Sequence, residues 1–248
     1  MDFTNVYDAK YYCDRQKDEY EYESTTGSIS ITKKRVSNVN VYMAHLTFNK
    51  YDRFKTYYHA TATTSQASKN TDAIFCVNSS AAKANGSGEM HDGVIPSFSA
   101  EKYCTPALYS QKTGMVIEGF GGPYANMKLK DIKQKGIATD TFGFGKAFLK
   151  DGKNTSGTGG SRRPRTFIGT NGKAGDIWIC VAEGDGVNGG GSGLTSYECA
   201  DILKGLGCTL GYPLDGGGSS SMVFQGTLLN TPTGGKERSG IGDFIYFV

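Results

Sequence analysis

Three glycines and three serines follow a single aspartate near the end of the sequence. Residues 212–226 read YPLDGGGSSSMVFQG, so Asp215 stands between two short apolar stretches and directly before Gly216. Consecutive glycines let backbone N–H groups converge on an anion such as phosphate, and serine hydroxyls add further donors. An aspartate beside a bound anion is unfavourable unless the chemistry uses its charge. The stretch therefore predicts a phosphate-binding turn with a functional carboxylate, and the simpler alternative is a flexible connection.

Known phosphate motifs do not account for this turn. A P-loop would require a GK[ST] sequence, which is missing here, and a dinucleotide fingerprint would continue into a helix. The apolar residues after Ser221 instead predict a strand. The turn must therefore be interpreted from its own residues.

Two arginines are candidates for holding the phosphate. The planar guanidinium group can bind two phosphate oxygens at once. Arg165 follows Pro164 and begins the apolar stretch RTFIGT, so we expect its direction to be fixed, and Arg238 stands just before the last apolar stretch. The neighbouring Arg162 and Arg163 fit a solvated loop. Arg165, Arg238 and the turn at 216–219 are expected to form a phosphate pocket.

A second carboxylate is expected in the glycine-rich loop EGDGVNGGGSG at 183–193. Glu183 and Asp185 are the candidates, although acids in such a loop also serve solubility. The three histidines, His45, His59 and His91, lack the spacing and the cysteine neighbours of a zinc site. No metal ligand and no cofactor is assigned. Calcium is left open, because carboxylates and carbonyls in glycine loops can hold it without a readable motif.

The elements that must position these residues can be read from the apolar spacing. Alternation over 28–48, broken at Ser37 and Asn38, predicts two paired strands. A strand is expected to end at Asn78, and residues 79–102 form a long polar loop of the length usually reserved for function. Residues 54–70 are expected to hold a short helix or a loop, and 126–136 a short surface helix.

The segment from 175 to 226 gives the best-defined unit. It reads as a strand (DIWICVA, 176–182), the glycine-rich loop, a helix, a return strand (CTLGYPL, 208–214) that leads to Asp215, and a final strand (SMVFQG). Thr195 and Glu198 have the spacing of a capping box, which places the start of the helix.

Composition bounds the fold class. The chain has 248 residues, 38% of them apolar, with 35 glycines and 12% aromatic residues, which favours strands and tight turns over long helices. We expect an α+β fold of mixed, mostly antiparallel β-sheets with a few packed helices. A lead-in segment at 1–27 would precede a single compact domain at 28–248.

Charge and hydropathy restrict the partners. A formal net charge of +3 is too small to indicate nucleic acid, and no stretch is long and apolar enough for a membrane span or a signal peptide. We expect a soluble protein, cytoplasmic or virion-associated, with no nucleic-acid or membrane partner and an oligomeric state that the sequence leaves open. The six cysteines lie far apart and are expected to be reduced and buried.

Taken together, these stretches resemble the phosphodiester glycosidase family. The closest parts are PRTFIG at 164–169, SGLTSYECADILKGLGC at 192–208, PLDGGGSSSMVFQG at 213–226 and ERSGIGDFIYFV at 237–248. VYMAHLTF at 41–48 and AIFCVNSS at 73–80 resemble the family more weakly. Asn78 is followed by Ser79 where the family has glycine, and the loop after Ala182 lacks the family's aspartate-glycine-arginine.

The resemblance implies hydrolysis of a sugar linked through its anomeric carbon to a small-molecule or glycan phosphodiester. Asp215 would assist a water molecule or stabilise positive charge on the sugar, with Glu183 or Asp185 as the second carboxylate. The remaining residues that the resemblance places at the substrate or phosphate are Asn78, Arg165, Thr166, Ser192, Thr195, Gly216, Gly217, Gly218, Ser219, Ser220 and Arg238. The alternative is a non-catalytic module that binds phosphorylated glycans on a virion or cell surface.

Overall fold

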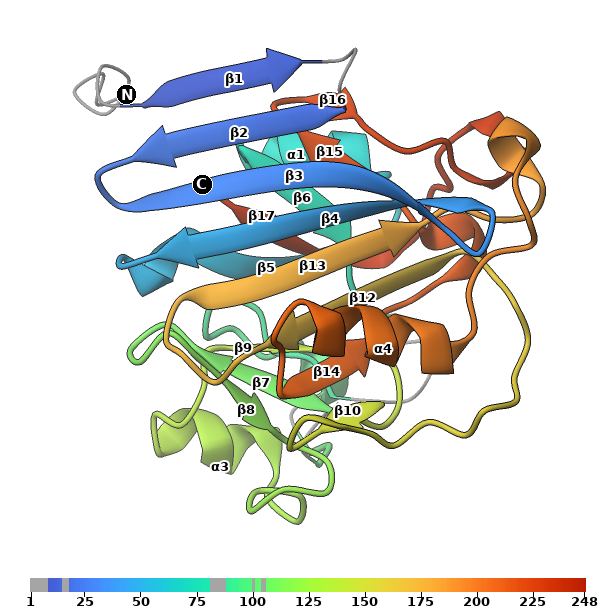
Figure 1. Ribbon diagram of the computed structural model, residues 1–248. Helices are drawn as coiled ribbons and strands as arrows, with labels where there is room; N and C mark the ends of the chain where they lie inside the picture. Colours follow the sequence, from blue (N-terminus) through green and yellow to red (C-terminus); the bar gives the residue numbers. More distant parts are fainter. Residues whose placement is uncertain (1–8, 15–17, 81–87, 100, 104–105) are drawn as a thin grey trace.

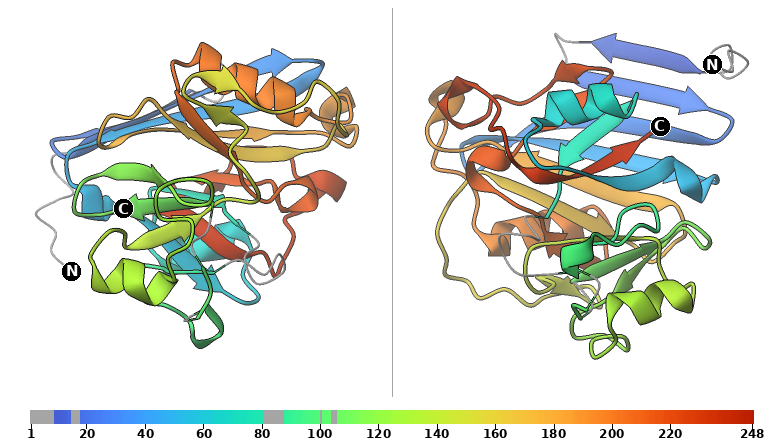
Figure 2. Two further views of the ribbon diagram at one scale, coloured as in Figure 1. Left: turned by 90° about the horizontal axis from the view of Figure 1, so that it is seen from below. Right: turned by 180° about the vertical axis from the view of Figure 1, so that it is seen from behind.

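Two layers of antiparallel β-sheet packed face to face form the body of the protein (Figures 1 and 2). The structure is a computed structural model that describes residues 9–14, 18–80, 88–99, 101–103 and 106–248. Every strand pair in these residues is antiparallel, so the antiparallel part of the predicted fold class is confirmed and no parallel pair accompanies it there.

The larger sheet has nine strands and carries the predicted 28–48 pair. Its two longest strands, β3 and β4, are joined by Ser37 and Asn38, which both have positive φ angles of 47° and 63°. Such a two-residue turn matches the twist of paired strands. The strand order is β1 (Lys10–Asp14), β2 (Glu19–Ser24), β3 (Gly27–Val36), β4 (Val39–Phe48), β13 (Asp176–Ala182), β12 (Arg165–Thr170), β14 (Leu210–Pro213), β10 (Leu149–Lys150) and β11 (Lys153–Asn154).

The second layer contains a five-stranded sheet and a three-stranded sheet. The five strands run in the order β16 (Thr227–Leu228), β15 (Met222–Phe224), β6 (Phe75–Asn78), β17 (Gly242–Phe247) and β5 (Phe54–His59). The three strands are β8 (Met115–Glu118), β7 (Ala107–Ser110) and β9 (Asp140–Phe142). The strand predicted to end at Asn78 is therefore confirmed. Residues 54–70, expected as a helix or a loop, contain both β5 and a helix.

Short helices cover the outer faces. α4 (Ser196–Gly205) lies on the nine-stranded sheet, α1 (Thr64–Asn70) on the five-stranded sheet, and α3 (Leu129–Gln134) beside the three-stranded sheet (Figures 1 and 2). Thr195 caps α4 through the capping box with Glu198 that the sequence predicts. Single 3-10 turns are η2 (Tyr51–Arg53), η3 (Ser97–Ser99), η4 (Val187–Gly189), η5 (Gly217–Ser219) and η6 (Thr233–Gly235).

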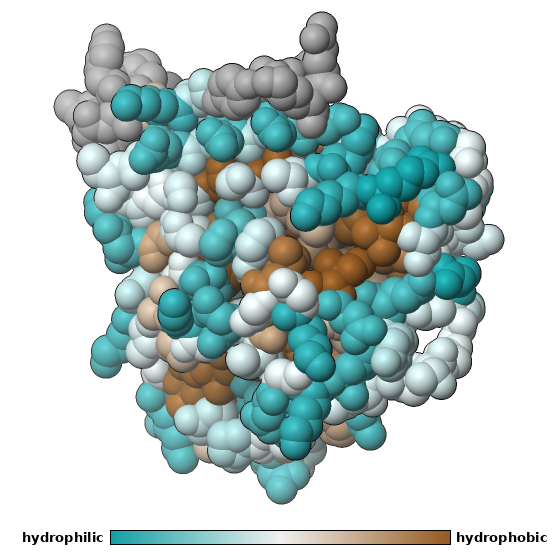
Figure 3. Space-filling model, in the orientation of Figure 1, coloured by the Kyte–Doolittle hydropathy of each residue, from teal (hydrophilic) through white to brown (hydrophobic). Residues whose placement is uncertain are grey.

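The main core lies between the two layers. Inward-facing residues of β3 such as Ile29 and Ile31 alternate with exposed ones and pack against Phe75 and Phe247 of the second layer. On the opposite face of the nine-stranded sheet, a second apolar cluster lies under α4, and Figure 3 shows an apolar band across the middle of this face.

The residues before position 28 take part in the large sheet. β2 pairs with β3 over its whole length, and Tyr20 and Tyr22 of β2 are buried in the main core. Arg53 donates a hydrogen bond of 2.8 Å to the Tyr22 hydroxyl, and its guanidinium lies 4.5 Å from the centre of the Phe247 ring. The segment 19–27 is thus tied to the last strand of the chain.

Four of the six cysteines can be placed in the interior of the protein. Cys76, Cys180, Cys199 and Cys208 are free and buried, as predicted, whereas Cys104 and the side chain of Cys13 lie outside the described residues. In the described ranges no helix has the length and apolarity needed to cross a bilayer.

Candidate active site

A cavity of about 360 Å³ opens beside the aspartate and glycine turn. This volume is within the range of small-molecule sites. The charged residues that line it are Glu89, Asp215, Arg238 and Asp243, and they are accompanied by Tyr58, Ala60, Ser219, Gly240, Ile241 and Gly242. The lining therefore comes from β5, the 79–102 loop, the turn after β14, and the segment that leads into β17. Two of the residues predicted as principal site residues, Asp215 and Arg238, share this cavity.

Asn78 and Ser79 hold the backbone of Asp215 in place. The Asn78 amide donates to the Asp215 carbonyl at 2.6 Å, and its carbonyl oxygen accepts from the Thr166 hydroxyl and the Ser221 N–H. Ser79 accepts the Asp215 N–H at 2.8 Å and donates its own N–H to the Asp243 carbonyl at 2.8 Å. Asn78 is fully buried. Its side chain therefore connects the end of β6 to β12 and to the glycine turn through hydrogen bonds.

Burial controls the charge of Asp215. Removal from water raises the pKa of its carboxyl, and the Ser219 side chain, the Arg238 charge and the Gly216 N–H partly offset that rise. The carboxylate thus interacts with a cation and with an N–H donor, but its charged form is less stable than that of an exposed aspartate. Such a carboxylate accepts a proton more readily than an exposed aspartate does.

The glycine turn needs its glycines for backbone reasons. Gly217 has φ +60°, and a β-carbon on Gly216 would lie 2.9 Å from the Pro164 carbonyl oxygen, closer than real β-carbons approach. The N–H groups of Gly217 and Ser219 donate to Pro164 O and Gly216 O. The Ser220 N–H donates to Gly217 O. The turn thus binds much of its own backbone, and fewer N–H groups converge on the cavity than the sequence predicts.

The two arginines occupy different places. Arg238 lines the cavity, and its Cδ lies 4.0 Å from the position of a β-carbon on Gly218. Its neighbour Glu237 anchors this segment by accepting the Ser65 N–H at 2.9 Å, in the first turn of α1. Arg165 is half-buried outside the lining of the cavity. There it donates to Leu194 O at 3.0 Å and to Ser161 O at 2.8 Å. Its role as a phosphate ligand stays a prediction.

The acids of the 183–193 loop lie outside the lining of the cavity. Glu183 is buried, and its carboxylate accepts from the Asn40 and Asn188 amides at 2.8 Å each and from the Thr231 N–H at 2.7 Å. Asp185 is exposed and accepts from the Thr233 hydroxyl at 2.8 Å. Both contacts join the loop to the 230–235 segment. Neither Glu183 nor Asp185 lines the cavity that holds Asp215, so the cavity does not support either of them as the second carboxylate.

The remaining predicted residues have mainly structural contacts. Thr166 is buried and donates to Asn78 at 2.8 Å, and Thr195 accepts the Glu198 N–H at the start of α4. Ser192 is exposed, Ser220 is buried under the turn, and Ser219 lines the cavity. Only Ser219 of this group therefore borders the space that holds Asp215.

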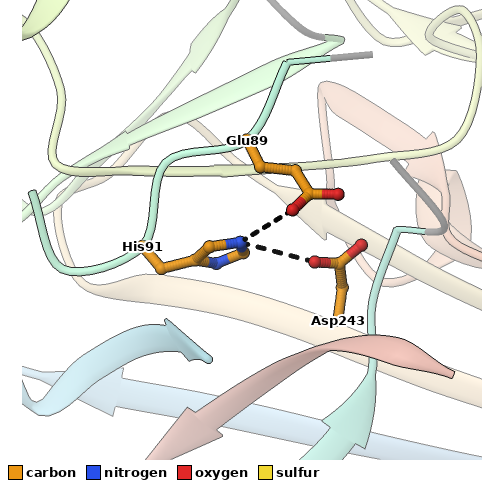
Figure 4. A group of neighbouring side chains, drawn as sticks. All are labelled: Glu89, His91 and Asp243. Carbon is orange, nitrogen blue, oxygen red and sulfur yellow. Dashed lines mark hydrogen bonds and ion pairs between the residues drawn. The ribbon is translucent and has the colours of Figure 1, made fainter. Parts of the chain in front are cut away.

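Three further side chains meet at the cavity wall and were not predicted. Glu89, His91 and Asp243 are all buried, and His91 Nε2 lies 3.5 Å from Glu89 Oε2 and 3.4 Å from Asp243 Oδ1 (Figure 4). Two sequence signals could have found them. Glu89 and His91 are a carboxylate and an imidazole only two positions apart in the polar string GSGEMHDGV, and Asp243 is an acid inside the apolar stretch GIGDFIYFV.

Comparisons with known proteins give one family model, a curated relative and solved structures of the same fold. A family model described as phosphodiester glycosidase matches residues 71–248. An uncharacterized protein (YomE) derived from the SPbeta prophage of Bacillus subtilis is 27% identical over 233 residues, which cover 88% of this chain and 35% of that protein. The chain thus spans about a third of the length of this curated relative.

Solved structures share the arrangement of strands at low identity. The catalytic domain of zebrafish N-acetylglucosamine-1-phosphodiester alpha-N-acetylglucosaminidase, auto-inhibited by its pro-peptide, gives a TM-score of 0.70 at 14% identity and covers 96% of this chain and 87% of its own. A putative exported protein of Burkholderia pseudomallei gives a TM-score of 0.55 at 12% identity and covers 85% of this chain and 74% of its own. These similarities establish the fold.

Proposed function

The chain belongs to the phosphodiester glycosidase family, and from this we propose that it is a hydrolase that cleaves a sugar-1-phosphodiester. The bond broken is the one between the anomeric carbon and the phosphodiester oxygen. The products are a free sugar and a phosphomonoester. The zebrafish enzyme of the same fold is named for such a phosphodiester, and this supports the proposed substrate class.

One observation carries the proposal: Asp215 and Arg238 face the same cavity from two segments that 22 residues separate in the sequence. A guanidinium can hold the phosphate oxygens and neutralise the charge that develops when the phosphomonoester leaves. A carboxylate on the other side can stabilise positive charge on the anomeric carbon or take a proton from the attacking water. Phosphate is already a good leaving group, so the cavity has less need of a strong acid.

The second carboxylate of the reaction is assigned to the cavity wall and not to the 183–193 loop. Glu89 and Asp243 line the cavity together with Asp215, whereas Glu183 lies outside the lining and accepts hydrogen bonds from Asn40, Asn188 and Thr231. Glycosidases work with a pair of carboxyl groups that flank the scissile bond. Glu89 or Asp243 supplies that partner in the proposed mechanism.

Hydrolysis in heavy-oxygen water tests which bond breaks. Attack at carbon places the label on the anomeric hydroxyl of the released sugar and leaves the phosphomonoester unlabelled, and this is the expected result. Label in the phosphomonoester would mean attack at phosphorus and would end the glycosidase proposal. Saturable binding of the diester with no turnover would instead indicate a phospho-glycan-binding module.

A further inference from the structure

We propose that Glu89, His91 and Asp243 form a binding site for one first-row divalent metal ion, with Zn²⁺ as the natural probe, in the wall of the cavity. The three candidate ligand atoms lie within 4.8 Å of one another, and all three residues are buried. They come from separate parts of the chain, the 79–102 loop and β17, which the fold brings together (Figure 4). Imidazole with two carboxylates is a ligand set that such metals use.

The hydrogen bonds behind His91 fix which nitrogen faces the carboxylates. Its Nδ1 lies 2.8 Å from the Thr56 hydroxyl, which is itself 2.9 Å from Asp140 Oδ1. A threonine hydroxyl has one hydrogen, and the carboxylate is the strongest acceptor in reach, so Thr56 donates to Asp140 and accepts from Nδ1–H. Nε2 then faces Glu89 and Asp243 (Figure 4). Metal-bound histidines are commonly held by such a partner on the far nitrogen.

Asp140 is well suited to anchor this chain of contacts. Its carboxylate also accepts the N–H groups of Thr56 and Asp92 at 2.8 and 2.9 Å. The Gln111 amide and the Thr139 hydroxyl donate to it at 2.9 and 2.8 Å. A carboxylate with this many donors acts as an acceptor only. The orientation of the His91 ring is therefore built into the packing between β5 and β9.

The distances at Nε2 favour a shared ion over a proton. A charged imidazole donating to a carboxylate gives an N···O distance of about 2.7–2.9 Å. Here Nε2 is nearly equidistant from two carboxylates, at 3.4 and 3.5 Å. These lengths match the edge of a coordination tetrahedron, which is about 1.6 times a metal–ligand distance of about 2.1 Å. The three ligand atoms lie within 4.8 Å of one another, so a small inward movement of the carboxylates brings all three into contact with one ion.

The charges in the cavity point the same way. Glu89, Asp215 and Asp243 face it with Arg238 as the single cation of the described lining. In addition, Glu89 Oε1 is buried without a hydrogen-bond partner among the described residues, in a side chain that is 1% exposed. Buried carboxylates in close proximity need a compensating charge. A divalent ion supplies it, and its open coordination position faces the cavity because Glu89 and Asp243 both line that space.

The ion would also change what the cavity binds and how it acts. With Glu89 and Asp243 as its ligands, the ion would take the place of the second carboxylate by polarising the substrate. Three carboxylates against one guanidinium repel an anionic substrate, whereas a divalent ion next to Arg238 makes the region attractive to phosphate oxygens. This consequence rests on the proposed function. The binding of the metal does not, because it follows from the ligand geometry alone.

Direct metal binding tests the site without any assay of turnover. The protein is dialysed against a chelator and titrated with Zn²⁺ in competition with a chromophoric chelator, and with Co²⁺ while its visible d–d bands are recorded. We expect one equivalent of each ion to bind and Co²⁺ to give a spectrum of low coordination number. Glu89→Gln, which keeps the size of the side chain, and His91→Gln should each weaken binding at least about tenfold. His45→Gln should bind as the unaltered protein does, because His45 pairs with Asp176 on the outer face of the large sheet.

A second pair of variants separates positioning from folding. Thr56→Val removes the hydroxyl that holds Nδ1 and should lower Zn²⁺ affinity by about 10–100-fold, and Thr56→Ser should restore it. Circular dichroism identifies any variant that fails to fold, and Glu89→Gln then decides alone. The site is overturned if the unaltered protein binds no stoichiometric ion, or if Glu89→Gln binds it equally well. Metal binding without hydrolysis would reject the proposed function and leave the site standing.

Discussion

At the scale of single residues, the cavity depends on how Asp215 carries its charge. The carboxyl is surrounded by protein, and this raises its pKa above the ordinary value of 3.8. Arg238 and the Gly216 N–H counteract that rise without abolishing it. The sequence predicted both Asp215 and Arg238 as site residues, and the fold brings them to one cavity although 22 residues separate them in the chain.

Asp215→Asn should abolish turnover and leave the protein folded. A raised pKa means that ionisation of Asp215 costs the folded state free energy. The stability of the unaltered protein therefore falls as pH rises from about 3.8 through the raised value. Melting temperatures of the two proteins should accordingly differ most near neutral pH, in favour of the asparagine variant, and converge on acidification. Near-normal kcat in the variant would remove Asp215 from the mechanism.

If the proposed function holds, the same ionisation should appear in the pH profile of turnover by the unaltered protein. If the carboxylate form of Asp215 is the active one, kcat/KM falls on the acid side with a pKa above 3.8. The profile is measured on a model sugar-1-phosphodiester. An acid limb at or below the ordinary aspartate value would contradict the assignment.

Arg238→Lys and Arg165→Lys should have separable effects. Arg238 lines the cavity, so the lysine variant should raise the inhibition constant of a simple phosphomonoester, since a point charge cannot grip two oxygens. Arg165 holds the carbonyls of Leu194 and Ser161, so its variant should mainly lower the melting temperature. A raised inhibition constant in the Arg165 variant would make that residue a phosphate ligand after all.

At the scale of elements, α4 shows how local sequence fixes structure. The hydroxyl of Thr195 accepts the Glu198 N–H at 3.2 Å, and the Glu198 carboxylate accepts the Thr195 N–H at 2.8 Å. Burial disfavours the charge of Glu198, but hydrogen bonds from Ser37, from Thr195 and from Arg162 lower its pKa to about 2. Glu198 in the first turn of α4 thus connects the helix to Ser37, in the turn between β3 and β4, and to Arg162, before β12.

Thr195→Ala should cost about 1 kcal/mol in the free energy of unfolding, and Thr195→Ser should cost little. Glu198→Gln should also destabilise the protein at neutral pH. A lowered pKa contributes stability that is present above the ordinary value near 4.5 and is lost as pH falls through about 2. The difference between this variant and the unaltered protein should therefore shrink below pH 4.5. Urea unfolding at several pH values measures it, and a difference that does not change with pH would contradict the capping role.

What the sequence predicts well is local, and what it misses depends on distant contacts. The 28–48 hairpin and the α4 cap follow from alternation and spacing within a few residues. Glu89, His91 and Asp243 meet only because β6 and β17 pair and the 79–102 loop returns to them. The role of Asn78 was likewise missed, since its partners Thr166 and Ser221 lie 88 and 143 residues away. Residue types alone cannot reveal which distant strands are neighbours.

At the scale of the whole molecule, the first strands belong to the same packed body as the cavity that holds Asp215. Tyr22 of β2 reaches the last strand through Arg53, and the main core contains residues from both layers. Removing such a side chain takes contacts from the layer interface.

Tyr22→Ala should destabilise the protein by about 3–5 kcal/mol, as for other large aromatic side chains in cores. Tyr103→Ala is the matched control, because Tyr103 is 59% exposed and its loss should stay within about 0.5 kcal/mol. Tyr22→Phe separates the hydroxyl bonded to Arg53 from the ring. Denaturant midpoints give the three values. Equal midpoints for the two alanine variants would mean that β2 is not part of the folding unit.

The backbone of Ser79 touches both layers at the cavity. It accepts the N–H of Asp215, which follows a strand of the nine-stranded sheet, and donates to Asp243, which belongs to the five-stranded sheet. The backbone positions of Asp215 and Asp243 therefore depend on how the two layers pack against each other. A core substitution that shifts one layer against the other would move these two residues apart or together without altering either of them. The arrangement of acids in the cavity thus rests in part on residues of the main core, none of which lines the cavity.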